Sequence, residues 1–147
     1  MPQLRVSHIG ICVSDAERSL RFYRDVFGFR PVGEIAVRGE PGDTLLRLKD
    51  VDLRAIYLER EGVRIELLVY ASPGHAGDGA PRAMNTLGLT HLSLRVDDVD
   101  AFLLRLEPAG GSVLADTRID IPEVQTRAIF VTDPDGTLIE LVQQPGD

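Results

Sequence analysis

An internal repeat constrains the fold of this chain more than any other feature of its sequence. The segment HIGICVSD at residues 8–15 aligns with HLSLRVDD at residues 91–98, at an offset of 83. A second pair of segments, GVRIELL at 62–68 and GTLIELV at 136–142, aligns at an offset of 74. The difference of nine residues can be held by extra loop or strand around Gly39–Asp50. The chain therefore contains two modules of similar length, and each begins with a histidine and ends with a glutamate.

Both modules show the same order of expected elements, namely a strand, a helix and three further strands. Alternating apolar residues rich in Ile and Val predict the strands, and apolar residues at helical spacing predict the helices. We expect Ser14 and Glu17 to form a capping box at the start of the first helix, and Gly28 to end that helix in a left-handed conformation. We expect Asp97 or Asp98 to cap the second helix. The expected strands are 4–13, 29–38, 44–59, 62–70, 88–96, 112–119, 126–132 and 137–143, and the expected helices are 14–27 and 98–107.

The length of 147 residues fits one domain made of these two modules. We expect a single domain over 1–147, with the first module at about 4–70 and the second at about 88–143. The stretch 71–87 contains SPGHAGDGAP, and this composition predicts a linker.

Two histidines and two glutamates occupy matching places in the modules: His8, Glu66, His91 and Glu140. Side chains alternate between the faces of a strand, and the neighbours of each of these residues form an apolar face on the opposite side. A glutamate in mid-strand between Ile and Leu is costly unless water, a cation or a metal satisfies it. Taken singly, a strand histidine is more often a surface residue, so the repetition is what favours a shared metal or substrate site.

Two imidazoles and two carboxylates suit a divalent ion such as zinc, nickel, cobalt, manganese or iron(II). Such an ion stabilises negative charge that develops on oxygen, and a carboxylate ligand can also accept a proton from carbon. The pattern therefore predicts one divalent metal ion per site.

Four further residues are candidates for substrate binding: Cys12, Tyr70, Ser93 and Arg95. Cys12 shares a strand face with His8, although a free cysteine is more often a small buried apolar residue. Ser93 and Arg95 share a face with His91, and they are nearly as compatible with an ordinary exposed surface. Tyr70 could line the same cavity or close the end of its strand.

Composition excludes several classes of function. The formal charge is −7, from 16 Lys and Arg against 23 Asp and Glu, and aromatic residues make up 5%. An acidic chain with few aromatic residues is a poor binder of nucleic acid. No stretch is long and apolar enough to span a membrane. Cys12 is the only cysteine, which excludes an internal disulfide and fits a cytoplasmic location.

The motifs resemble those of the vicinal oxygen chelate superfamily, which includes glyoxalase I, methylmalonyl-CoA epimerase, extradiol dioxygenases, and fosfomycin- and bleomycin-resistance proteins. The resemblance covers nearly the whole chain and rests on HIGICVSD with LRFYRDVFGF, on RIELL, on GLTHLSLRVDDVDAF and on DPDGTLIEL. It implies an α+β fold in which two tandem βαβββ modules form a curled mixed sheet around a central cavity. It also implies a homodimer and a set of four metal ligands, His8, Glu66, His91 and Glu140.

Within this superfamily, Glu66 matches the glyoxalase I enzymes. The resemblance then implies a metal-dependent lyase or isomerase that moves a proton next to a carbonyl through a metal-bound enediolate, with Glu140 or Glu66 as the base and a small molecule as substrate. An epimerase acting on acyl thioesters is an alternative, although such enzymes usually carry Gln at the position of Glu66. Extradiol-type dioxygenases use two His and one Glu, and non-catalytic antibiotic-binding resistance proteins typically lack the ligand set. Cys12 and Tyr70 stand where bacterial glyoxalase I usually has Arg and Asn for glutathione, so the substrate stays open.

Overall fold

The structure, a computed structural model, describes residues 1–146 and divides into two compact units. The first unit ends at Ala76 and the second begins at Gly77, inside the predicted linker. Each unit contains a four-stranded mixed sheet and runs in the order strand, helix and three strands, which confirms the α+β fold of two tandem βαβββ modules. No helix within residues 1–146 is both long and apolar enough to cross a membrane.

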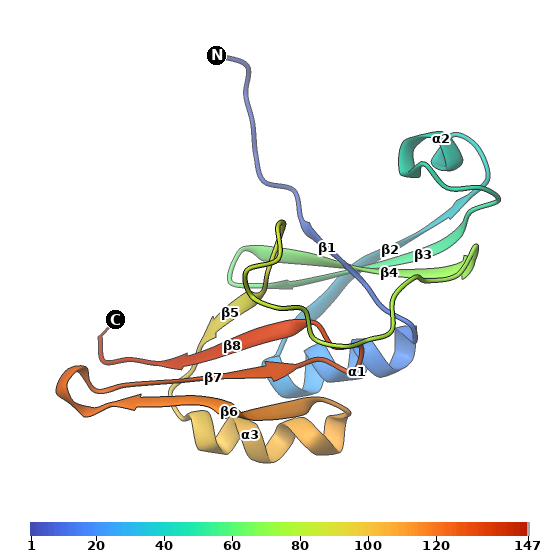
Figure 1. Ribbon diagram of the computed structural model, residues 1–147. Helices are drawn as coiled ribbons and strands as arrows, with labels where there is room; N and C mark the ends of the chain where they lie inside the picture. The colour runs from blue at the N-terminus through green and yellow to red at the C-terminus, as the bar shows by residue number, and fades with distance from the viewer. Residues whose placement is uncertain (147) are drawn as a thin grey trace. The chain divides into compact units, whose positions relative to one another are not determined.

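The sheet of the first unit has the strand order β1-β4-β3-β2 (Figure 1). β1 runs parallel to β4, and the other neighbouring strands are antiparallel. Helix α1 contacts β4, and side chains of the helix and sheet that are fully buried form the core between them, among them Phe22, Tyr23, Leu58, Ile65 and Leu67. The elements are β1 (Ile9–Cys12), α1 (Ala16–Phe27), β2 (Arg30–Arg38), α2 (Gly42–Leu46), β3 (Asp52–Arg60) and β4 (Val63–Ser72).

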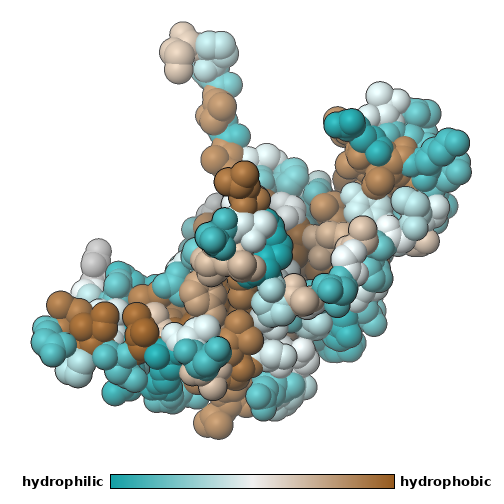
Figure 2. Space-filling view, in the orientation of Figure 1, coloured by the Kyte–Doolittle hydropathy of each residue, from teal (hydrophilic) through white to brown (hydrophobic). Residues whose placement is uncertain are grey.

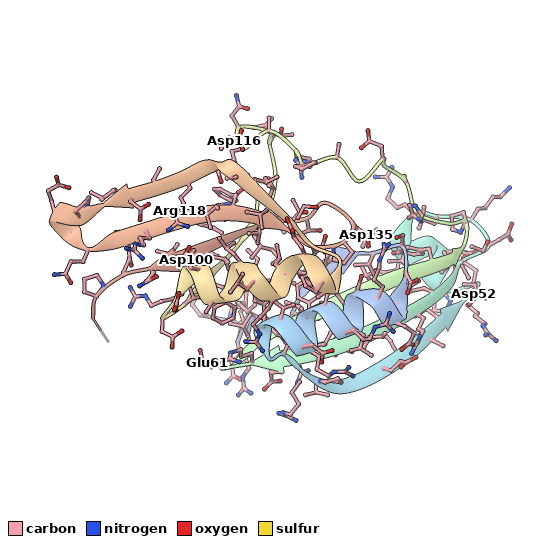
Figure 3. All side chains as sticks on the ribbon, turned by 90° about the horizontal axis from the view of Figure 1, so that it is seen from below. Asp52, Glu61, Asp100, Asp116, Arg118 and Asp135 are labelled. Atoms are coloured by element: carbon pink, nitrogen blue, oxygen red, sulfur yellow. The ribbon has the colours of Figure 1, made fainter. Side chains whose placement is uncertain are left out.

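The sheet of the second unit repeats this topology in the order β5-β8-β7-β6. Helix α3 contacts β6, β7 and β8, and Leu106, Val131 and Ile139 are fully buried. Arg118 of β6 donates a hydrogen bond to Asp100 of α3 at 2.6 Å (Figure 3), and this contact raises the pKa of Arg118. The elements are β5 (Leu92–Arg95), α3 (Val99–Leu106), the 3-10 turns Glu107–Ala109 and Pro122–Val124, β6 (Ser112–Ile121), β7 (Thr126–Thr132) and β8 (Leu138–Gln143).

Asp15 caps helix α1, so the predicted capping box of Ser14 and Glu17 is wrong. The Asp15 carboxylate accepts a hydrogen bond from the Arg18 N–H at 2.9 Å, which lowers the pKa of Asp15. Glu17 instead pairs with Arg54 of β3 at 2.9 Å. Gly28 ends the helix at a φ of 70°, as predicted. Asp15, and not Ser14, is the residue directly before the first helical residue, and from that position a side-chain oxygen accepts a hydrogen bond from a free N–H of the first turn.

The nine extra residues of the first module form α2 and its flanking turns. Residues 39–51 separate β2 from β3, whereas only 122–125 separate β6 from β7. The prediction of a strand from residue 44 is therefore wrong at its start. Leu46 of α2 packs against a cluster of buried side chains, Val51, Leu53 and Ala55, which holds the inserted segment to the sheet.

The first strand of each module is shorter than predicted. β1 covers 9–12 of the expected 4–13, and β5 covers 92–95 of the expected 88–96. The apolar side chains that precede them are highly exposed, at 87% for Leu4, 85% for Val6, 96% for Leu87 and 80% for Leu89. Figure 2 shows apolar atoms along the N-terminal segment. A strand needs a hydrogen-bonded neighbour, and within residues 1–146 neither segment belongs to a ladder.

Candidate functional site

His8 and Glu66 lie side by side in the first unit. Glu66 is in the middle of β4 and pairs across the parallel ladder with Gly10, two residues after His8. The Nε2 atom of His8 lies 3.5 Å from Oε1 of Glu66, and the Ser7 hydroxyl lies 2.8 Å from Nδ1 of the same histidine. The neighbours of Glu66 in β4 are fully buried on the helix-covered face. The carboxylate therefore occupies the other face of the sheet, as the alternation of side chains predicts.

His91 and Glu140 lie in the same arrangement in the second unit. Glu140 of β8 pairs with Ser93, which is again two residues after the histidine. The Nε2 atom of His91 lies 3.2 Å from Oε2 of Glu140, and the Thr90 hydroxyl lies 2.8 Å from Nδ1. The repeat therefore extends from the sequence to the strand register and to the hydrogen bond on each imidazole.

An aromatic ring packs edge-on against each histidine. The ring of Tyr57 is 5.4 Å from that of His8 at 78°, and the ring of Phe130 is 5.2 Å from that of His91 at 79°. Tyr57 pairs with Glu66 across the β3–β4 hairpin, and Phe130 pairs with Glu140 across the β7–β8 hairpin. A hydrogen bond between its hydroxyl and Glu66 raises the pKa of Tyr57, and burial adds to the shift.

Tyr57 and Phe130 are not among the residues predicted from the sequence. Their offset is 73 residues, which differs from the 74 of the glutamates, so the repeat alone does not align them. The signal that could have identified these two residues is the register of the two strands in each hairpin. Counting outward from the turns at 61–62 and 133–137 places each aromatic residue opposite its glutamate.

Each His–Glu pair offers one imidazole nitrogen and one carboxylate to a cation. The chemistry fits, because a hydroxyl that accepts the Nδ1 proton of a histidine leaves the Nε2 lone pair available to a metal. The side chains also keep access to solvent, with 33% of His8, 25% of His91 and 27% of Glu140 exposed. Within residues 1–146, however, no group of three or more His, Cys, Asp or Glu side chains is placed to hold an ion. The structure thus brings His8 to Glu66 and His91 to Glu140.

The predicted substrate-binding residues are placed differently in the two units. Cys12 is exposed, so the interpretation of this cysteine as a buried apolar residue is wrong. Cys12 pairs with Leu68 of β4, and Tyr70, two residues further along β4, packs against the cluster of Val51, Leu53 and Ala55. Burial raises the pKa of Tyr70, and the charges of Cys12 and Glu66 raise it further. Ser93 and Arg95 are exposed, and Arg95 donates a hydrogen bond to Gln144 at 2.7 Å. The structure therefore places Cys12 opposite Leu68 and Tyr70 against the Val51 cluster, and it directs the Arg95 guanidinium to the end of β8.

Comparison with known proteins identifies relatives over the whole chain. The model of a family described as the glyoxalase/bleomycin resistance protein/dioxygenase superfamily matches residues 5–141. An uncharacterized protein of Escherichia coli, YaeR, is 35% identical over 141 residues, which are 95% of this chain and 96% of the relative. A probable lactoylglutathione lyase of Vibrio parahaemolyticus is 27% identical over 95% of this chain and 90% of the relative.

Solved structures share the fold. A glyoxalase family protein from Bacillus cereus superposes with a TM-score of 0.84 at 22% identity, over 99% of this chain and 97% of that one. The fosfomycin resistance protein FosX of Listeria monocytogenes, in complex with Mn(II) and sulfate, superposes with a TM-score of 0.58 at 17% identity, over 96% of this chain and 93% of that one. At these identities the likeness concerns the fold alone.

Proposed function

This chain belongs to the glyoxalase/bleomycin resistance protein/dioxygenase superfamily, and from that membership we propose that it is a metal-dependent lyase or isomerase of the glyoxalase type. The observation that carries the proposal is the matching pair of His–Glu contacts, at 3.5 Å in the first unit and 3.2 Å in the second. In the first unit His8 and Glu66, and in the second unit His91 and Glu140, would each supply one nitrogen and one oxygen ligand to a zinc, nickel, cobalt, manganese or iron(II) ion.

The chemistry of this ligand set suits proton transfer next to a carbonyl. A divalent cation held there would act as a Lewis acid for negative charge developing on two neighbouring oxygens of a small-molecule substrate. Ser7 and Thr90 keep the two imidazoles oriented through Nδ1. Glu66 or Glu140 takes the proton from one carbon and returns it to the adjacent carbon.

Two relatives support this function. The resemblance to a probable lactoylglutathione lyase, at 27% identity, favours lyase chemistry. The shared fold with a manganese complex of FosX favours a divalent cation in this fold. Cys12 and Tyr70 would contact the substrate in the first unit, and Ser93 and Arg95 would do so in the second.

The test combines metal analysis with proton exchange. Protein purified without chelators should contain one divalent ion per chain, and should exchange carbon-bound hydrogen of a hemithioacetal in deuterated water. Glu140→Gln should reduce that exchange at least about 100-fold without changing the far-ultraviolet circular dichroism spectrum. Exchange with acyl thioesters alone would identify an epimerase, and oxygen consumption with a catechol would identify a dioxygenase. Absence of a bound ion, together with tight binding of a bulky ligand, would refute the enzyme in favour of a binding protein.

We also propose a cytoplasmic homodimer with no nucleic-acid or membrane partner. The exposed Leu4, Val6, Leu87 and Leu89 support a dimer, because β1 and β5 are edge strands and apolar residues beside an open edge favour pairing with another chain. Sedimentation should show a dimer for the native chain and a monomer for Leu4→Ser combined with Leu87→Ser. Val124→Ser, at a residue 56% exposed on a turn, is the matched control and should leave the dimer intact. A native monomer would refute the proposed assembly.

A further inference from the structure

One face of the second sheet carries His91 together with a single exposed arginine, and we call it the His91 face. Arg95 ends β5 four residues after His91, so the alternation of side chains places both residues on this face. The other two arginines of the sheet, Arg118 and Arg127, contact Asp100 of α3 at 2.6 and 3.8 Å and therefore lie on the opposite, helix-covered face. Among the strand residues of this sheet, all of which the structure describes, Arg95 is thus the one Lys or Arg on the His91 face.

Gln144 orients the Arg95 side chain. The Nη2 atom of Arg95 donates a hydrogen bond to Oε1 of Gln144 at 2.7 Å. The preceding residue, Gln143, accepts a hydrogen bond from the Val99 N–H at the start of α3, so Gln143 is directed to the helix and Gln144 to the His91 face. A guanidinium presents five N–H donors in a planar fork, so one that is held by a neutral amide can still bind both oxygens of a carboxylate or phosphate.

An apolar row of side chains crosses the sheet from Arg95. The strand registers pair Arg95 with Val142, Val142 with Ala128, and Ala128 with Ile119. Ile119 is 50% exposed, and the other two apolar side chains are half-buried. Glu140 precedes Val142 by two residues, so this row lies about 7 Å along the strand from the glutamate. An apolar group that covers the row next to the His–Glu pair is stabilised by the surface that it removes from water.

We propose that the second unit recognises an amphipathic substrate, whose apolar body covers the row that ends at Ile119 and whose terminal oxyanion, a carboxylate or a phosphate, binds Arg95. This inference rests on the function proposed above and deepens it, because it names the class of substrate. Gln144 lies four residues beyond Glu140, or about 13 Å along the strand. An oxyanion beside Gln144 and a carbonyl beside Glu140 are therefore the two ends of an elongated molecule.

The first unit has no matching cation. The offsets of 83 and 74 that relate the modules place Cys12 at the position of Arg95 and Tyr70 at the position of Gln144. Neither side chain carries a positive charge, so the recognition of an oxyanion is assigned to the second unit. The row also discriminates against a peptide-like body, because amide groups lose water against Val142 without gaining a hydrogen bond.

Three thiols of similar length test the substrate class with the full-length native chain. They are mercaptohexanoate, mercaptopentyl phosphate and mercaptohexanamide, each converted to its hemithioacetal with methylglyoxal. The kcat/KM for proton exchange in deuterated water should be about 10- to 100-fold higher for either anionic conjugate than for the amide, because a guanidinium forms charge-assisted hydrogen bonds only with the anions. Comparison of the two anionic conjugates then identifies the oxyanion.

Substitution of Arg95 tests whether this residue supplies the preference. Arg95→Gln should raise KM for the anionic conjugates about 10- to 100-fold, with little change in kcat and no change in KM for the amide. Arg95→Lys keeps the charge but loses the planar fork, and should give an intermediate KM. The matched control is Arg105→Gln, which removes the same charge from an exposed position on α3 and should leave all three conjugates unaffected.

Substitution of Ile119 tests the apolar row. Ile119→Ser should raise KM for the mercaptohexanoate conjugate about three- to tenfold, and should leave KM unchanged for the compact hemithioacetal of methanethiol, which does not reach the row. Val124→Ser, at an exposed turn residue outside the row, is the matched control and should change neither value.

The outcomes separate this inference from the function on which it rests. A native chain that exchanges protons with no hemithioacetal overturns the proposed function and the substrate class together. Exchange that is equally fast with anionic and amide conjugates, or a preference that persists in Arg95→Gln, overturns only the role of Arg95. Faster exchange with the conjugate of a peptide thiol that ends in a carboxylate overturns the apolar body. So does an Ile119→Ser variant with altered sedimentation and unaltered KM, because the row would then be a contact between copies of the chain.

Discussion

Replacing Asp133 with alanine should destabilise the second unit more than any other single change in its hairpin turn. Asp133 is only 1% exposed and directly follows β7, at the start of the turn that leads into β8, the strand that carries Glu140. Its Oδ1 atom accepts hydrogen bonds from the backbone N–H groups of Asp135 at 3.0 Å and Thr137 at 2.9 Å. The side chain thus closes the turn from inside, and alanine cannot replace it.

The expected loss follows from the two N–H groups that would be left without an acceptor. An unsatisfied buried donor costs about 1–3 kcal/mol, and we take about 1.5 kcal/mol for each because both lie in a partly exposed turn. Asp133→Ala should therefore lower the free energy of unfolding by about 3 kcal/mol. Asp133→Asn keeps an acceptor at the same place and should cost only about 1 kcal/mol, since a neutral acceptor binds more weakly than a carboxylate.

Urea unfolding followed by far-ultraviolet circular dichroism measures the total effect, and hydrogen exchange locates it. Peptides covering 126–143 should lose protection in Asp133→Ala, whereas peptides covering 52–72 should not. The matched control is Glu61→Ala in the corresponding turn of the first unit, where the exposed side chain predicts a change within about 0.5 kcal/mol (Figure 3). A loss below about 1 kcal/mol for Asp133→Ala would contradict the stabilising role of the Asp133 carboxylate, because it would show that water replaces both hydrogen bonds.

Three further predictions follow from other parts of the structure. Glu61 has a φ of 50° in the two-residue turn that it forms with Gly62, and asparagine tolerates that conformation better than glutamate. Glu61→Asn should therefore increase the free energy of unfolding by about 0.5–1 kcal/mol in urea titrations, and a decrease would contradict the assigned turn. The backbone N–H of Arg18 lowers the pKa of Asp15, so the stabilisation by Asp15 is present above the ordinary value of 3.8 and is lost as the pH falls through the lowered value. The difference in melting temperature between the native chain and Asp15→Ala should accordingly shrink in acid, and a constant difference would argue against an ionised cap. Dialysis against EDTA should lower the melting temperature. Addition of zinc at 100 times its dissociation constant should then increase the free energy of unfolding by about 2.7 kcal/mol. No response to either treatment would argue against a cation bound to the folded state.

Much of the fold could be predicted from the sequence because the information was local and occurred twice. The two-residue period of a strand sets the face of each side chain from its immediate neighbours, so the apolar residues around Glu66 and Glu140 were enough to place both glutamates opposite the helices. The difference between the two repeat offsets likewise located the inserted segment that became α2. The contacts of His8 with Glu66 and of His91 with Glu140 agree with these placements, while the role of the four residues as metal ligands stays a prediction.

Other features depended on neighbours that are distant in the chain. The segment that begins at Leu4 has the alternation of a strand, but a strand forms only where another backbone supplies hydrogen bonds, and sequence pattern does not supply a partner. The choice between Ser14 and Asp15 as the helix cap depended on backbone geometry at a single residue. The exposure of Cys12 similarly depended on what packs beside the edge strand β1.

The residues alone predict the repeated order of strands and helices, and they place one histidine and one glutamate at the same point of each module. The side chains that surround each pair became known from the folded hairpins, because residues opposite one another in a hairpin are related by register and turn length rather than by a fixed spacing between the modules. Tyr57 and Phe130 are the clearest case. The offset between these two residues differs by one from the offset between the glutamates, which conceals their equivalence along the chain. The two hairpins nevertheless bring each ring to the same place beside its histidine and glutamate.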